Sequence, residues 1–166
     1  MSRARLTHLT ARGEAHMVDV GAKEVTVRVA RAIARVHMSA ASLTALGAGN
    51  TPKGDVLATA RIAGIQAAKR TPDLIPLCHT IALTRVTIDI VIEPEAVVIA
   101  ATAEARDRTG VEMEAMVAAS TAALTIYDML KAIDRTMTIE IALEEKTGGK
   151  SGPFKRARRQ HGPRRP

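Results

Sequence analysis

Residues 84–101 read TRVTIDIVIEPEAVVIAA, and this stretch indicates the fold more directly than any other part of the chain. Val86, Ile88 and Ile90 alternate with polar residues, which is the period-two pattern of a strand with one buried face. The Glu-Pro-Glu sequence at 93–95 predicts a turn, after which apolar residues alternate again. The stretch is therefore predicted to be a β-hairpin.

The sequence on both sides of this hairpin adds helices and strands. Apolar periodicity predicts a strand at about 25–38, a short helix at 40–46, a helix at 54–70 ended by Thr71-Pro72, a helix at 110–135 and a strand at 139–143. This order, βαββαβ with one extra short helix, predicts an α+β fold of the ferredoxin-like type. In such a fold an antiparallel sheet has its helices packed on one face.

Composition and charge indicate one domain followed by a basic tail. The chain has 166 residues and is 46% hydrophobic, which suits a single globular core. Residues 146–166 contain eight Lys or Arg and no acid, so the formal charge of +7 arises at this end and the rest carries −1. We expect a single domain over 1–154, with an irregular lead-in at 1–20, and a disordered basic tail at 155–166.

Single residue types argue against several classes of protein. Tyr127 and Phe154 are the only large aromatic rings, whereas single-stranded nucleic acids are usually bound by aromatic stacking, so we expect no nucleic-acid partner. Cys78 is the only cysteine, which excludes an internal disulfide, and the five histidines lack the HxxxH spacing of a zinc site. Because the chain has neither an apolar run of roughly 20 residues nor a signal peptide, we expect a soluble cytoplasmic protein without a metal site.

The helix predicted at 110–135 has charged residues at both of its ends. Glu112 and Glu114 open it, and Asp128 and Lys131 close it. These charges could have a purely structural role, because acids in a first turn and a lysine in a last turn complement the helix dipole. Asp128 and Lys131 are three residues apart and share one face, so they form either a surface ion pair or a buried acid–base pair.

A glycine-rich segment at 148–152, GGKSG, resembles the end of a phosphate-binding P-loop. The P-loop pattern requires a glycine at position 144, where this chain has Glu144, and a helix after the Lys-Ser pair, where it has Gly-Pro. The segment is therefore not a P-loop. It is either a plain linker or a flexible arm that carries Lys146 or Lys150 over an anionic ligand.

Three further residues have both a structural and a functional interpretation. Lys53 precedes a helix N-terminus, where an anion could bind, but it could equally be a solvated loop lysine. His79 lies in an apolar loop, where a histidine is more often buried and hydrogen-bonded than catalytic. Cys78 has no cationic neighbour in the sequence that would lower its pKa, so we do not expect a nucleophile.

Longer motifs are spread over residues 6–154. They are HMVDV at 16–20, KGDV at 53–56 with ARIAGI at 60–65, KRT at 69–71 with DLIPLCH at 73–79, TGVEMEA at 109–115, ALTIYDM at 123–129 with Lys131-Ala132, and Lys146 with GGKSG at 148–152. Together they resemble the molybdenum-cofactor biosynthesis protein C family, the cyclic pyranopterin monophosphate synthases.

The resemblance implies a lyase of molybdenum cofactor biosynthesis with a ferredoxin-like catalytic domain. Its reaction would convert (8S)-3′,8-cyclo-7,8-dihydroguanosine 5′-triphosphate to cyclic pyranopterin monophosphate with release of pyrophosphate. No cofactor is required, although magnesium could accompany the triphosphate or the pyrophosphate. Members of the family are homo-oligomers, so the resemblance also implies a hexamer built as a trimer of dimers.

The resemblance also implies the roles of individual residues. The catalytic pair is Asp128 and Lys131, and the substrate-binding residues are Leu77, Cys78, His79, Glu112, Met113, Glu114, Lys53, Lys146 and Arg28. These residue types suit the chemistry. Basic side chains bind a triphosphate, carboxylates accept from the N–H edge of a guanine-derived base, and an acid–base pair transfers protons.

Two features keep other interpretations open. Thr80 follows His79 where the family usually has proline, which favours a catalytically weakened paralogue that binds nucleotide or pterin without turnover. The basic tail is the only support for a nucleic-acid-binding protein.

Glu112 and Asp128 are sixteen residues, or about 24 Å, apart on one predicted helix, so we expect sites at a subunit interface.

Overall fold

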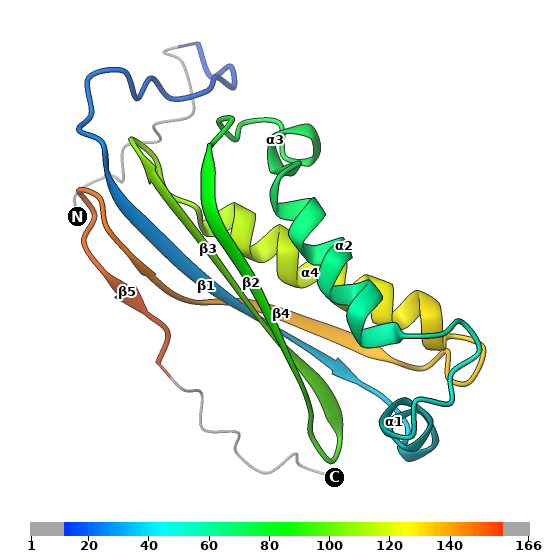
Figure 1. Ribbon diagram of the computed structural model, residues 1–166. Coiled ribbons are helices and arrows are strands. Elements are labelled where there is room, and N and C mark those ends of the chain that lie inside the picture. The colour runs from blue at the N-terminus through cyan, green and yellow to red at the C-terminus, as the bar shows by residue number, and fades with distance from the viewer. Residues whose placement is uncertain (1–11, 158–166) are drawn as a thin grey trace, which may run out of the picture.

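An antiparallel sheet forms the centre of the fold (Figure 1). In the computed structural model, which describes residues 12–157, the strand order is β2-β3-β1-β4-β5. The strands are β1 (Thr26–His37), β2 (Leu83–Ile92), β3 (Ala96–Asp107), β4 (Thr138–Thr147) and β5 (Phe154–Lys155). Residues 1–11 of the predicted lead-in and 158–166 of the predicted tail lie outside the described residues.

The helices are α1 (Ala40–Gly47), α2 (Val56–Ala68), α3 (Thr71–Leu74) and α4 (Glu112–Leu130). The helices α2 and α4 lie side by side against one face of the sheet, as Figure 1 shows. The central strand β1 pairs antiparallel with β3 on one side and with β4 on the other. The predicted ferredoxin-like α+β fold is thereby confirmed.

The helix ends differ from the prediction for identifiable reasons. The helix predicted at 54–70 begins at Val56, because Asp55 is its N-cap and accepts a 2.9 Å hydrogen bond from the amide of Ala58. That helix ends at Ala68, two residues before the predicted end at 70, and Thr71-Pro72 begins the short helix α3, which was not predicted. The helix α4 ends at Leu130 rather than near 135.

Small side chains let the helices lie close to the sheet. The helix-facing side of β1 carries Ala30, Ala32 and Ala34, all fully buried. Where α2 crosses α4, a Cβ added at Gly64 would lie only 2.9 Å from the backbone oxygen of Ala118. The two helices therefore touch through a position without a side chain.

The opposite face of the sheet has no helix packed on it within residues 12–157 (Figure 1). Val29 and Ile33 of β1 point to this face and are half-buried, and Val27 is exposed. Ion pairs tie neighbouring strands and turns together, with Arg35 2.8 Å from Glu93 and Arg85 3.6 Å from Glu104. None of the helices in this described range is long and apolar enough to cross a membrane.

Candidate active site

The predicted site residues gather at the two ends of α4. Glu112, Met113 and Glu114 occupy its first turn, and Asp128 and Lys131 lie at its last turn and C-cap. Glu112 and Asp128 are sixteen positions apart, which corresponds to about 24 Å along the helix axis. Within one chain, the residues at 112–114 therefore lie far from Asp128 and Lys131.

A cavity of about 380 Å³ lies at the N-terminal end of α4. Six predicted substrate-binding residues line it together: Leu77, Cys78 and His79 from the loop after α3, and Glu112, Met113 and Glu114 from α4. The apolar loop that contains His79 therefore forms part of the cavity lining.

Glu114 is the most perturbed acid in the cavity. It is only 2% exposed, and this burial raises its pKa to about 7, with the negative charges of Glu112 and Asp107 adding to the shift. Near neutral pH the side chain therefore exists in both forms. It can donate a hydrogen bond as the acid or accept one as the carboxylate.

Cys78 and His79 lie beside this acid. Burial, and then the charge of Glu114, raise the pKa of the Cys78 thiol, so the group remains protonated and is a poor nucleophile. The Nε2 atom of His79 lies 2.8 Å from the backbone oxygen of Val18. Because a carbonyl oxygen only accepts, Nε2 carries the hydrogen of this bond.

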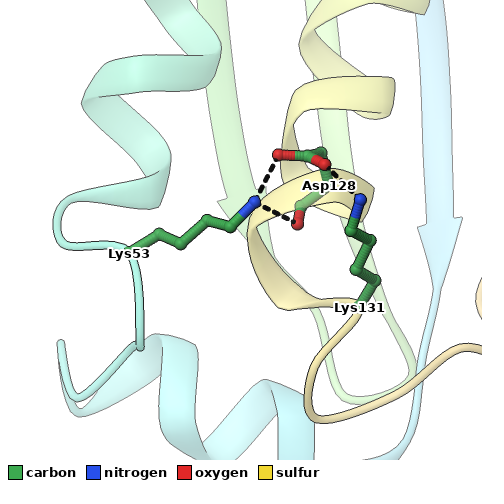
Figure 2. A network of polar contacts seen from close by, with 3 residues as sticks. All are labelled: Lys53, Asp128 and Lys131. Carbon is green, nitrogen blue, oxygen red and sulfur yellow. Dashed lines mark hydrogen bonds and ion pairs between the residues drawn. The ribbon is translucent and has the colours of Figure 1, made fainter.

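A charged cluster lies at the C-terminal end of α4, and Figure 2 shows its three side chains converging. The Lys53 ammonium is 2.6 Å from Oδ2 of Asp128 and also donates to the Asp128 backbone oxygen at 3.1 Å. Lys131 is 2.6 Å from Oδ1 of the same carboxylate. Hydrogen bonds from Lys131 and then Lys53 lower the pKa of Asp128 to about 2, so the cluster holds one carboxylate and two ammonium groups.

This cluster is open to solvent. The side chains of Lys53, Asp128 and Lys131 are 46%, 54% and 51% exposed. In the single chain the Asp128–Lys131 pair is therefore an exposed ion pair and not a buried acid–base pair. With its net positive charge the cluster can receive an anionic group from solution.

The other two predicted basic residues lie at the cavity end of the molecule. Arg28 is buried and its Nε donates to the backbone oxygen of Asp107 at 3.1 Å. Lys146 pairs across the sheet with Ala30, and its ammonium bonds the hydroxyl of Ser151. Arg28 and Lys146 are therefore not brought together with Lys53.

The glycine-rich turn after β4 covers the Arg28 guanidinium. Gly148 and Gly149 have φ values of +87° and +81°, which favour glycine. A Cβ at Gly149 would collide with Nη1 of Arg28. In the described residues this segment is thus not a free linker, because Gly149 packs on a predicted site residue.

Comparison with known proteins covers all of these positions. The model of the MoaC family matches residues 17–149, which include every predicted site residue. A cyclic pyranopterin monophosphate synthase of Herpetosiphon aurantiacus is 60% identical over 152 residues, which is 90% of this chain and 93% of the relative. The chain belongs to the MoaC family.

Two further relatives carry the same name. The cyclic pyranopterin monophosphate synthase of a Nostoc species is 56% identical over 154 residues, covering 91% of this chain and 92% of its own length. That of Streptomyces avermitilis is 54% identical over 154 residues, covering 92% of this chain and 91% of its own.

The cavity of this MoaC-family chain has more lining residues than the sequence analysis named. The additional ones are Val18, Val20, Lys23, Ile81, Thr109 and Gly110. Val18 and Val20 belong to the HMVDV motif, and Thr109 and Gly110 begin the TGVEMEA motif, so the motifs were a usable signal. Lys23 and Ile81 belong to no quoted motif, and only the folded chain places them here.

Within residues 12–157 of the MoaC-family chain, no three His, Cys, Asp or Glu side chains are grouped closely enough to hold a metal ion. Taken together, the cavity offers carboxyl groups for the N–H donors of a base, and the Lys53–Asp128–Lys131 cluster offers ammonium groups for an anion.

Proposed function

We infer that this chain is a cyclic pyranopterin monophosphate synthase, a lyase of molybdenum cofactor biosynthesis. The observation that carries this inference is the 54–60% identity to proteins of that name over at least nine-tenths of each chain. The substrate is then a nucleotide-derived small molecule, (8S)-3′,8-cyclo-7,8-dihydroguanosine 5′-triphosphate, which is converted to cyclic pyranopterin monophosphate and pyrophosphate.

In this proposal the cavity binds the base of the substrate. The carboxyl groups of Glu112 and Glu114 accept hydrogen bonds from the N–H edge of the guanine-derived ring, and Leu77, Cys78, His79 and Met113 complete the contacts. Support comes from the grouping of all six residues around one cavity of suitable size. The partly protonated state of Glu114 allows it either to donate to or to accept from the ring.

The basic residues bind the triphosphate and stabilise the leaving pyrophosphate. Lys53, Lys146 and Arg28 have this role, and Asp128 with Lys131 transfers protons during rearrangement of the sugar and base. In the free protein Asp128 is a weak base, because two lysines hold its pKa near 2. A phosphate that draws Lys53 or Lys131 away removes these hydrogen bonds and raises the pKa of Asp128, which makes it a better base when substrate is bound.

We further propose a hexamer, a trimer of dimers, with active sites at a subunit interface. The distance of about 24 Å between Glu112 and Asp128 supports this, because one nucleotide bound in a pocket does not reach both ends of α4. The sheet face that bears Val27, Val29 and Ile33 also has apolar surface available for a second subunit.

The proposed compartment is the cytoplasm, and no cofactor is required, with magnesium accompanying the triphosphate or pyrophosphate. Cys78 is a free thiol, as is usual in a reducing compartment. The three basic residues Lys53, Lys146 and Arg28 supply the positive charge that a triphosphate needs.

The experiment is to incubate the purified full-length oligomer with the cyclised GTP precursor and to measure pyrophosphate and the pterin product. We expect one pyrophosphate per precursor consumed, and none from GTP used as a control. A folded oligomer that binds the precursor but releases no pyrophosphate would overturn the proposal in favour of a binding-only paralogue.

A further inference from the structure

A short segment before β1 forms one wall of the cavity. Residues 16–23, which we call the strap, contribute Val18, Val20 and Lys23 to the lining. Six of the eight strap residues are exposed, and only Val18 and Val20 are half-buried. The strap therefore buries little surface of its own while it covers a cavity built by the helical part of the domain.

Two side chains from elsewhere in the fold bind backbone carbonyl groups of the strap. His79 Nε2 lies 2.8 Å from the oxygen of Val18, and Arg108 Nε donates to the oxygen of Lys23 at 3.0 Å. The two contacts lie near the middle and at the end of the strap. They reach it from the two segments that flank the cavity, the loop after α3 and the connection between β3 and α4.

The strap is also folded by short-range hydrogen bonds. The amide of Lys23 donates to the oxygen of Val20 at 3.0 Å, and the amide of Gly21 donates to Oδ1 of Asp19 at 2.7 Å. Turns of this length are not stable by themselves, so these bonds open together with the bonds to His79 and Arg108. An exposed segment held in this way opens at a lower free energy than the helices and sheet below it.

The position of Lys23 gives the closed strap a chemical consequence. Lys23 is the only Lys or Arg among the described residues that line the cavity, and Glu112 and Glu114 lie in the same lining. Closure therefore brings a positive charge to a cavity that otherwise carries acids. An open strap would leave the cavity wider and more negative.

We propose that Arg108 and His79 are positioning residues that hold the strap closed, so that Val18, Val20 and Lys23 complete the substrate cavity, and that the strap opens to admit the ligand. The inference rests on the proposed function only in taking this cavity as the substrate site. Arg108 itself does not line the cavity, so its effect on binding must pass through the strap.

The test uses Arg108→Met, which removes the donor, and Arg108→Lys, which keeps a charged donor. Arg106→Met is the matched control, because Arg106 is exposed two residues away on β3 and its loss changes the net charge equally. Hydrogen exchange of the Gly21 and Lys23 amides and the rate of tryptic cleavage after Lys23 are measured on the full-length protein without ligand. We expect both rates to rise several-fold, up to about tenfold, in Arg108→Met, and the rise to be smaller in Arg108→Lys.

Arg106→Met should show the same exchange and cleavage rates in the strap as the unsubstituted chain. Hydrogen exchange in α4 should stay unchanged in all variants. With the precursor, Arg108→Met should raise KM several-fold at nearly constant kcat. Strap exchange equal to that of Arg106→Met, or faster exchange spread through α4, would overturn the proposal. Since the exchange and cleavage measurements need no turnover, a protein without synthase activity would still report on the strap.

Discussion

The Asp128 carboxylate lies 2.6 Å from the ammonium of Lys53, a residue 75 positions earlier in the chain (Figure 2). This contact joins the loop before α2 to the C-terminal end of α4. Lys131 binds the other carboxylate oxygen at the same distance of 2.6 Å. Asp128 is therefore placed between two cations, and its charge is the property that substitution should test first.

Asp128→Asn keeps the shape of the side chain and removes its negative charge and its ability to take up a proton. We expect turnover of the precursor to be abolished while its binding stays within about tenfold, because the ammonium groups of Lys53 and Lys131 remain. Pyrophosphate release and calorimetric binding measure the two effects separately. Near-normal turnover would assign Asp128 a structural role.

Sharing of sites between subunits can be tested by mixing two inactive variants. Glu114→Ala removes an acid at the N-terminal end of α4, and Asp128→Asn removes the carboxylate at its C-terminal end. If each site takes its two ends from different subunits, random exchange of subunits should restore about a quarter of the normal activity. Each variant alone, carried through the same exchange procedure, is the control. A mixture as inactive as its components would exclude shared sites.

The burial of Glu114 should make stability depend on pH. Its pKa is raised from an ordinary 4.5 to about 7 in the folded state, so the folded protein keeps this proton when the unfolded chain has lost it. The stabilisation is therefore fully present below about pH 4.5 and is lost as the pH rises through 7, by an amount on the order of 3 kcal/mol.

Glu114→Gln should remove this component of the pH dependence, as measured by urea unfolding at pH 5 and pH 8. The control is Glu95→Gln, because Glu95 lies in the exposed turn between β2 and β3. Parallel pH profiles for the unsubstituted chain and Glu114→Gln would show that this side chain is not the source.

Gly64→Ala should destabilise the fold by about 1–3 kcal/mol, because the new methyl group meets the backbone oxygen of Ala118 at 2.9 Å and neither helix can move without disturbing the core. Gly47→Ala is a suitable comparison, since a Cβ there has no neighbour within 4 Å. Thermal unfolding of both variants measures the difference. Equal melting temperatures would mean that α2 and α4 separate easily.

Thr80→Pro tests whether the departure from the usual proline matters. The ring of His79 is already held by the backbone oxygen of Val18, so we expect turnover to change by no more than about twofold. The assay is pyrophosphate release at saturating precursor. A large gain in activity would instead show that Thr80 weakens the enzyme.

The sequence by itself was enough to predict the hairpin, the long helix and the ferredoxin-like order. These features depend on local periodicity, which reflects the burial of one face of a strand or helix. Motif resemblance was enough to indicate the family and to name nine candidate substrate-binding residues, of which six do line one cavity. The exact helix ends were less predictable, because Asp55 acts as a cap and Thr71-Pro72 begins a new turn.

Only the tertiary structure decided which of these residues meet. The contact of Lys53 with Asp128, the packing of Gly149 on Arg28 and the binding of the strap by His79 all join residues that are far apart in the chain. The pKa of Glu114 likewise depends on the surfaces that bury it. Such contacts depend on how the helices, the sheet and the connecting loops pack together, and no local pattern encodes that geometry because it arises from many long-range contacts at once.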